Sequence, residues 1–169
     1  MRRSDKAGTE SERLLREAPV CRLGFAAIGH GAEAPASAAG AAGWDGYPYV
    51  VPLHFAWDGE ALYIHCAREG DKLRRLDQDN RVCIEIDEFA GIVPASLPCK
   101  VSSRYRSLIA FGRAEEVADP GQKSRALTAI AVKYGGAAMA DHTYTAKELE
   151  AVTVLRVRPE DLAVKRSGD

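Results

Sequence analysis

Apolar and polar positions alternate with a period of two along much of the chain, and this pattern predicts β-strands. Turn residues or short helical segments separate the alternating stretches. The six predicted strands cover residues 20–28, 47–57, 61–67, 81–87, 104–117 and 151–158. Gly112, inside the fifth of these strands, predicts a bulge or a bend in it.

The segment from residue 47 to residue 67 predicts a hairpin, because Asp58-Gly59 is a strong two-residue turn signal. One face of its first strand is wholly apolar or aromatic, and we interpret that face as core. The face carries Tyr49, Val51, Leu53, Phe55 and Trp57. Pro52 belongs to the other face and predicts an edge strand or a bulge, where the backbone leaves its ladder.

Helices are predicted where a capping residue precedes an apolar period of 3.6 residues. The predicted helices cover residues 9–18, 71–76 and 119–134, with a brief fourth helix after the capping box Thr145-x-x-Glu148. Residues 90–99 contain Gly and Pro and predict an irregular loop. Because hairpins dominate and strands do not alternate strictly with helices, the order predicts one mainly β domain with flanking helices, closed into a small six-stranded antiparallel barrel.

The segment 31–45 interrupts this pattern, because seven of the eleven residues from Ala32 to Ala42 are alanine. Pro35 and Gly40 break any long helix there. We interpret the segment as a mobile insertion between two strands. A short Ala-rich helix is the competing interpretation, although isolated short helices are marginal in water.

Composition excludes several classes of function. The chain has 169 residues, with 23 Lys and Arg against 24 Asp and Glu, and this balance attracts neither nucleic acid nor anionic lipid. No run of 18 apolar residues predicts a membrane span, and the N-terminus lacks the apolar region of a secretory signal, so the expected location is the cytoplasm. The four cysteines form no CxxC pair and are interpreted as reduced structural thiols.

A zinc site is disfavoured, although His54 and His65 lie on opposite arms of the predicted hairpin. Zinc needs three or four convergent ligands, and Cys66 points to the opposite face of its strand from His65. The same orientation disfavours a Cys–His nucleophile. We therefore predict no metal site.

The stretch YIHCAREGDKLRRL, residues 63–76, is the most informative one for chemistry. A strand ends, a Gly-containing loop follows, and a helix begins with Lys72 in its first turn. The free N–H groups and the dipole of a helix start favour an anion such as a phosphate monoester, and Arg68 adds charge. An ordinary solvated helix with Arg74 and Arg75 on its outer face is the alternative.

Residues 100–113 form a second basic feature, with four cations and no acid. The cations are Lys100, Arg104, Arg106 and Arg113. Such a segment serves a phosphate or an acidic partner, or is simply a solvated strand face.

Four motifs occur in a fixed order: PYVVPLHF at 48–55, YIHCAREGDKLRRL at 63–76, NRVCIEID at 80–87 and YRSLIAFGRAEEVAD at 105–119. Together they resemble the pyridoxamine 5'-phosphate oxidase-like, FMN-binding split-barrel proteins, and most of all their nitroimidazole-resistance, flavin-nucleotide-binding branch. The resemblance covers nearly the whole chain except the Ala-rich insertion. It implies a split β-barrel, an FMN cofactor and a homodimer with FMN at the subunit interface.

The resemblance also implies a role for each matching residue. The backbone of Val51, Pro52 and Leu53 would lie against the flavin ring, and His65 and Cys66 would border the ring and the ribityl chain. His65 also matches the histidine that the branch uses in nitro-group chemistry, so it is the predicted catalytic residue.

The remaining implied contacts concern the phosphate and the far side of the flavin. Lys72 would contact the phosphate, and Ser107, with Tyr105, would face the flavin. The oxidase proper has an Arg-Lys pair at the phosphate turn, whereas this chain has Asp71-Lys72, so Arg68 or an Arg of 104–106 would supply the second cation.

The function that follows is an FMN-dependent oxidoreductase acting on a small molecule, such as a nitroaromatic or a quinone, with NAD(P)H as a possible electron donor. Oxidation of pyridoxamine phosphate is not expected, because the C-terminus lacks the family's Trp- and Arg-rich substrate segment. A non-catalytic flavin- or heme-binding module is the alternative, and a silent dimer scaffold is a third. A barrel this small is filled by its own side chains, so a flavin would lie outside it, in a dimer cleft.

Overall fold

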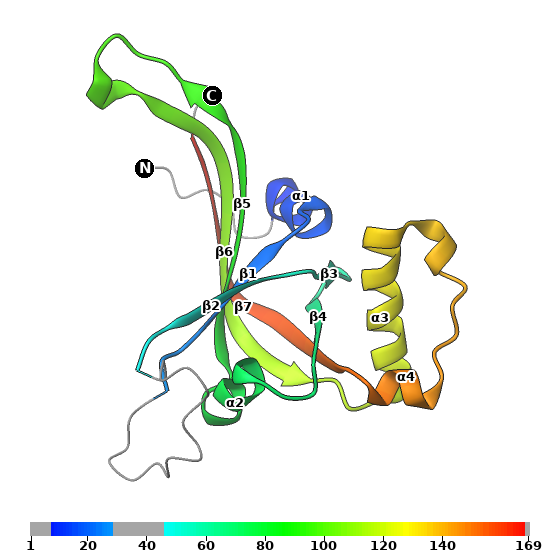
Figure 1. The fold of residues 1–169 in the computed structure, drawn as a ribbon. Coiled ribbons are helices and arrows are strands. Elements are labelled where there is room, and N and C mark those ends of the chain that lie inside the picture. Colours follow the sequence, from blue (N-terminus) through cyan, green and yellow to red (C-terminus); the bar gives the residue numbers. More distant parts are fainter. Residues whose placement is uncertain (1–7, 29–45, 168–169) are drawn as a thin grey trace.

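A single seven-stranded antiparallel sheet with helices around it forms the computed structural model, which describes residues 8–28 and 46–167 (Figure 1). The strand order is β2-β1-β5-β6-β7-β4-β3. The strands are β1 (Cys21–Phe25), β2 (Tyr49–Leu53), β3 (Ala56–Trp57), β4 (Leu62–Cys66), β5 (Arg81–Val93), β6 (Ser102–Glu116) and β7 (Thr153–Ser167). The helices are α1 (Thr9–Glu17), α2 (Asp71–Gln78), α3 (Pro120–Gly135) and α4 (Ala146–Glu150), with the 3-10 turns η2 (Pro98–Lys100) and η3 (Ala137–Met139).

The predicted class, mainly β with flanking helices, is confirmed, although the sheet has seven strands and not six. The extra strand arises because the predicted strand over 47–57 is divided into β2 and β3. These two strands form opposite edges of the sheet but are separated by only two residues, His54 and Phe55. The sheet must therefore curl until its two edge strands come together at this link, which closes the barrel there while the rest of each edge stays unpaired in the sheet described.

The break between β2 and β3 is held by the side chain of Tyr134. Its hydroxyl accepts a hydrogen bond from the Phe55 N–H at 3.0 Å and lies 2.9 Å from the carbonyl oxygen of Pro19. Backbone groups that leave a ladder must find other partners, and this hydroxyl supplies them. Pro52 lies within β2, opposite Arg22 of β1, and β2 is an edge strand, so the predicted edge position is confirmed. The β1–β2 ladder ends after Leu53 and not at Pro52.

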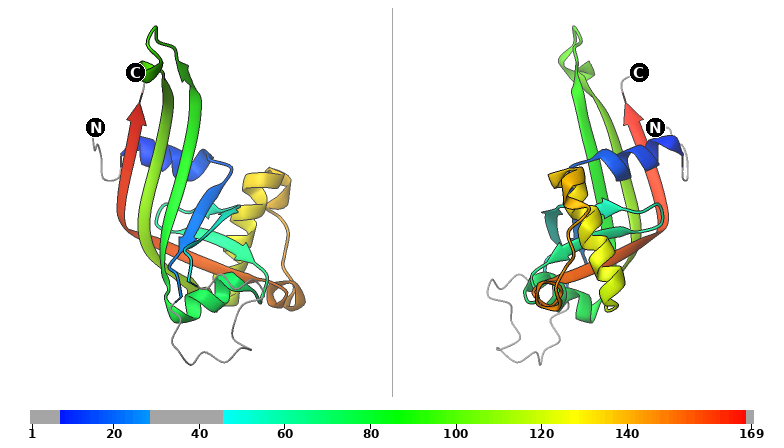
Figure 2. Two further views of the ribbon diagram at one scale, coloured as in Figure 1. Left: turned by 60° about the vertical axis from the view of Figure 1, so that its left-hand side comes forward. Right: turned by 90° about the vertical axis from the view of Figure 1, so that its right-hand side faces the viewer.

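Strands β5 and β7 are longer than the sequence predicts. The loop predicted over 90–99 is wrong for its first four residues, because β5 continues to Val93 through a bulge between Phe89 and Gly91. Gly91 has φ 125°, a conformation that glycine adopts without strain, so the glycine bends the strand without ending it. β7 continues past its predicted end at residue 158 to Ser167. The long β5–β6 hairpin projects from the body of the molecule (Figure 2).

The core fills the concave side of the curled sheet. Phe55 is fully buried, and the other members of the face predicted as core pack against the same cluster. Those partly buried members are Tyr49, Val51, Leu53 and Trp57. Burying a phenylalanine side chain such as that of Phe55 contributes ~2–3 kcal/mol to the free energy of folding, so this face stabilises the closed sheet. Leu14 and Leu15 of α1 close one end of the cluster.

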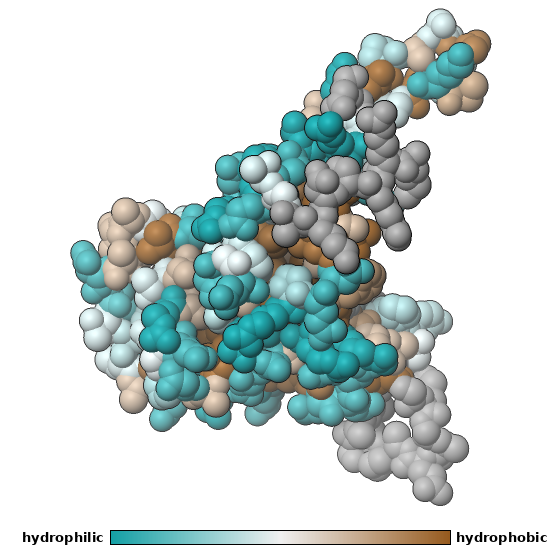
Figure 3. Space-filling view, turned by 180° about the vertical axis from the view of Figure 1, so that it is seen from behind, coloured by the Kyte–Doolittle hydropathy of each residue, from teal (hydrophilic) through white to brown (hydrophobic). Residues whose placement is uncertain are grey.

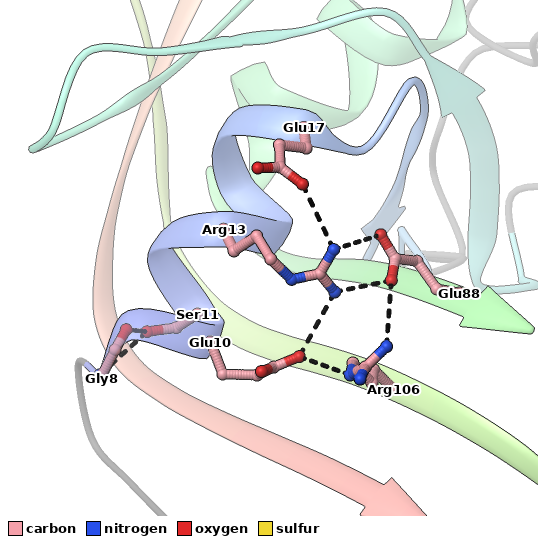
Figure 4. A network of polar contacts seen from close by, with 7 residues as sticks. All are labelled: Gly8, Glu10, Ser11, Arg13, Glu17, Glu88 and Arg106. Atoms are coloured by element: carbon pink, nitrogen blue, oxygen red, sulfur yellow. Dashed lines mark hydrogen bonds and ion pairs between the residues drawn. The ribbon is translucent and has the colours of Figure 1, made fainter. Parts of the chain in front are cut away.

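Helix α1 is tied to the base of the projecting hairpin by a charged network (Figure 4). The guanidinium of Arg13 lies 2.6 Å from the carboxylate of Glu88 in β5 and 3.3 Å from that of Glu10. Arg106 of β6 lies 2.8 Å from the carboxylate of Glu10. Glu88 and Glu10 together hold the pKa of Arg13 above its ordinary value. A network of this kind orients α1 better than isolated surface pairs do.

The bulge predicted at Gly112 is confirmed. The register between β6 and β7 shifts between Phe111 and Gly112, where Gly112 lies opposite Pro159. A Cβ atom at Gly112 would lie 2.3 Å from the carbonyl oxygen of Arg158. The two strands therefore approach closely only because residue 112 has no side chain.

Replacing Gly112 by Ala is expected to lower the free energy of unfolding by roughly 2–4 kcal/mol, because the backbone of Arg158 must move away. Urea denaturation measures the change. Gly24→Ala is the matched control, since a Cβ there meets its nearest atom at an ordinary 3.5 Å. Equal stability of the two variants would contradict the close approach at Gly112.

Candidate functional site

The end of β4 and the start of α2 form the part of the molecule where the predicted site residues are most concentrated. His65 is exposed and Cys66 is buried, so the two side chains lie on opposite faces of β4, as predicted. Burial raises the pKa of the Cys66 thiol, and the positive charge of Lys72 opposes that increase. Lys72 of α2 therefore lies within electrostatic reach of Cys66.

Helix α2 begins without a side-chain cap. Its N-cap residue is Gly70, with φ 130°, a conformation that a residue with a side chain rarely adopts. The first intrahelical bond runs from the Arg74 N–H to the Gly70 carbonyl, so the preceding N–H groups have no acceptor within the helix. The carboxylate of Asp71 is held 2.9 Å from Arg74. The start of α2 thus has N–H groups and the Lys72 ammonium that could meet an anion, and the phosphate contact stays a prediction.

Arg75 does not lie on a solvated helix face, so that alternative interpretation is wrong for this residue. The side chain is buried and donates hydrogen bonds from Nη1 to the carbonyl oxygens of Ala26 and Tyr47, each at 3.1 Å. Its guanidinium also lies 5.2 Å from the centre of the Tyr49 ring. Arg75 therefore anchors α2 to the chain around β1 and β2. No pattern in the sequence distinguishes it from Arg74, because only the fold brings those carbonyls to it.

The predicted ring contacts on β2 are available through its backbone. The side chains of Val51 and Leu53 pack against the core, while Pro52 is exposed on the other face. Because β2 is an edge strand of the sheet described, its backbone bonds only to β1. Its free edge therefore presents N–H and C=O groups, which is what the predicted role of residues 51–53 requires.

Ser107 and Tyr105 lie far from the β4–α2 junction within one chain. Ser107 of β6 is paired with Lys165 of β7, whereas His65 of β4 is paired with Val154 of the same strand. Eleven residues of β7 separate these two levels (165 − 154), which is ~36 Å of strand at 3.3 Å per residue. Within one copy of the chain, Ser107 and His65 are therefore far apart along β7.

Two of the four cations in the basic segment 100–113 are paired with acids. Arg106 is engaged by Glu10, and Arg113 lies 3.4 Å from the carboxylate of Glu160. Glu10 and Glu160 lie outside residues 100–113, so the composition of that segment could not predict these ion pairs. Arg106 is therefore not available as the second phosphate cation, whereas Arg68 is exposed in the loop before α2.

Other candidate chemistry is not assembled in the part of the chain that the structure describes. No three His, Cys, Asp or Glu side chains among residues 8–28 and 46–167 are placed to hold a metal ion. The ring of His54 stacks on that of Tyr134, with 4.2 Å between the ring centres.

No helix within residues 8–28 and 46–167 is long and apolar enough to cross a membrane. The insertion predicted over 31–45 lies entirely outside the described residues.

A family model described as pyridoxamine 5'-phosphate oxidase matches residues 8–166, nearly the whole chain. The chain belongs to the pyridoxamine 5'-phosphate oxidase family. The resemblance that the four motifs indicated is thereby confirmed. No curated protein matches the chain significantly.

Solved structures support the fold of this family member. A protein from Bacteroides thetaiotaomicron VPI-5482, provisionally named a 5-nitroimidazole antibiotic resistance protein, is 25% identical with a TM-score of 0.69, over 90% of this chain and 80% of that one. The FAD and heme binding protein from Mycobacterium smegmatis is 23% identical with a TM-score of 0.79, over 98% and 73%. A FAD-binding protein from Mesorhizobium loti is 21% identical with a TM-score of 0.63, over 99% and 100%.

Replacing Arg75 by Ala is expected to lower the free energy of unfolding by roughly 2–4 kcal/mol, because two carbonyl oxygens lose a charged donor in a buried place. Thermal or urea unfolding measures it. Arg74→Ala is the control on the same helix and is expected to cost less, since Arg74 is only partly buried and its pair with Asp71 is a local i,i+3 contact. A larger loss for Arg74→Ala than for Arg75→Ala would refute the anchoring role.

Proposed function

We propose that this member of the pyridoxamine 5'-phosphate oxidase family binds FMN between two copies of the chain and is an FMN-dependent oxidoreductase. The observation that carries the proposal is the uncapped start of α2, with Lys72 in its first turn and within electrostatic reach of Cys66. This is the position to which the family resemblance assigns the flavin phosphate.

The phosphate would be held by the first turn of α2. Lys72 supplies a compact positive charge, and the free N–H groups of the turn supply directed donors. Arg68, exposed in the preceding loop, is the proposed second cation in place of the family's Arg. The residues present therefore fit a phosphate monoester.

The flavin ring would lie along the free edge of β2, where the backbone of residues 51–53 is available. Ser107 and Tyr105 of β6 lie far from His65 along the sheet, so we assign them to the partner's site. The interior of the barrel supports this arrangement, because its apolar side chains leave no room for a flavin there.

The outer face of the sheet supports a second copy on physical grounds. A groove of about 500 Å³ crosses it, and its walls include Val50, Cys83 and Phe111. Val50 is 60% exposed and Phe111 53% exposed, which is unusual for large apolar side chains. An apolar face with a groove marks an interaction surface, and a second copy would cover it.

When bound, FMN supplies hydride or electron transfer, and the protein supplies placement and charge. His65 is exposed at the end of β4, close in sequence to the phosphate turn, so its imidazole is accessible to a bound molecule. We propose that it donates a proton to the reduced substrate. Nitroaromatic or quinone-like small molecules are the proposed substrates, with NADH or NADPH as the electron donor.

A non-catalytic module that carries a flavin or a heme is the second candidate. The likeness of fold to the FAD and heme binding protein from Mycobacterium smegmatis supports this second candidate. The two candidates differ in turnover and not in binding, so one experiment separates them.

The purified full-length protein, titrated with FMN, is expected to show the shifted visible absorbance of a bound flavin. NADH or NADPH is then expected to bleach that absorbance under anaerobic conditions, and a nitroaromatic acceptor to restore it. A bound flavin that neither donor reduces would favour the non-catalytic module. A protein that ignores added FMN would overturn both candidates.

Lys72→Ala is expected to weaken FMN binding by about 10–100-fold, because a charge-assisted contact to the phosphate contributes roughly 1.5–3 kcal/mol. The matched control is Lys147→Ala, an exposed lysine on α4, which is expected to bind FMN like the parent chain. Riboflavin, which lacks the phosphate, should bind the parent and Lys72→Ala equally. Unchanged FMN affinity in Lys72→Ala would refute the phosphate assignment.

A further inference from the structure

A cavity separate from the proposed flavin site lies between α1, β3 and α3. Its volume is about 600 Å³, which is in the range of small-molecule sites. None of the residues predicted to contact the flavin lines it. A molecule in this cavity would therefore contact a different set of side chains from those predicted to contact the flavin.

The walls of this cavity carry positive charge. Three of its lining side chains are cationic, namely Arg16, Arg125 and Lys133, and no lining side chain is acidic. Arg16 is balanced by Glu12, whose carboxylate lies 2.5 Å away. Neither Arg125 nor Lys133 has an acidic side chain within 4.0 Å among the described residues. The cavity therefore keeps an uncompensated positive charge.

Lys133 is the most constrained of these cations. Its Nζ atom is buried, has no hydrogen-bond acceptor in the described part of the chain, and lies 3.5 Å from the centre of the Phe55 ring. Burial lowers the pKa of Lys133 to about 8 and raises that of the neighbouring Cys21 thiol to about 12, so Cys21 supplies no counter-charge near neutral pH. An ammonium without an acceptor is costly to bury, and an entering anion would supply one.

Part of the cavity wall is apolar. Trp57 contributes its indole, which is held in place because its Nε1 donates to the Glu12 carboxylate at 3.0 Å. Ala129 and Val132 of α3 face the same space. Small side chains on a helix that shares a cavity with a fixed indole leave room for a planar ring.

The polar groups on α3 follow the spacing of one helix face. Ser124 and Thr128 are four residues apart, so both hydroxyls lie along the same side of the helix as Arg125 and the cavity. Hydroxyls beside cations are suited to the oxygens of a carboxylate. The face thus combines charge, donors and an apolar slot.

We propose that this cavity binds a small aromatic carboxylate, with the ring against Trp57 and the carboxylate between Arg125 and Lys133. Lys133 is brought to the anion by rotation of its flexible stem, exchanging the Phe55 ring for a charged acceptor. The inference does not depend on the proposed flavin function, because the two sites share no residue.

The test uses 2-naphthoate as the probe and the indole NH resonance of Trp57 as the readout, assigned with Trp57→Phe because Trp44 is the second tryptophan. Titration of the full-length protein is expected to shift this resonance in a saturable way. The neutral analogue 2-naphthamide is expected to bind at least about 10-fold more weakly, since it lacks the charge that meets Arg125 and Lys133.

Arg125→Gln and Lys133→Met are each expected to weaken 2-naphthoate at least about 5-fold. Arg125 is exposed, so Arg125→Gln tests the site even where Lys133→Met disturbs the core. Arg81→Gln, an exposed arginine outside the cavity, is the matched control and is expected to leave the affinity unchanged.

Three results would overturn the inference. Equal affinity for 2-naphthoate and 2-naphthamide would show an apolar patch without anion recognition. Unchanged affinity in Arg125→Gln together with Lys133→Met would show that the probe binds elsewhere. Displacement of 2-naphthoate by FMN would assign the cavity to the flavin site.

Discussion

The two-residue link between β2 and β3 is the constraint on which the rest of the structure depends. β2 and β3 are the opposite edges of a seven-stranded sheet, so a link of His54 and Phe55 forces those edges together. Phe55 is buried at the link, and Tyr134 bonds its backbone N–H. Closure, core and the docking of α3 are therefore set at one place.

Closure also explains why one chain gathers only part of the predicted flavin site. A curled sheet filled by its own side chains has its chemistry on the outside and along its edges. The start of α2 and the free edge of β2 lie on one part of that exterior, while Ser107 lies farther along the projecting strands. Large apolar side chains remain exposed, some of them on the projecting hairpin (Figure 3), and the proposed second copy would cover part of such a surface.

Cations in this chain differ in role because they differ in what the fold places beside them. Arg106 meets Glu10 and becomes part of the network that orients α1. Arg75 meets two backbone carbonyls and becomes an anchor. Lys72 and Lys133 meet no acid within the described residues, and both are proposed to meet an anion. Residue type alone does not distinguish these cases.

The sequence by itself determined most of the elements, the core face of residues 49–57, the bulge at Gly112 and the family, because each depends on local spacing or on an ordered set of motifs. The start of α2 beside Cys66 was likewise predictable from a strand, a glycine and a lysine in succession. Only the tertiary structure decided that β2 and β3 are separate edges, that Arg75 is buried and that Lys133 lacks a counter-charge. These features depend on contacts between segments distant in sequence, such as Tyr134 with Phe55, and no local pattern encodes which segments meet.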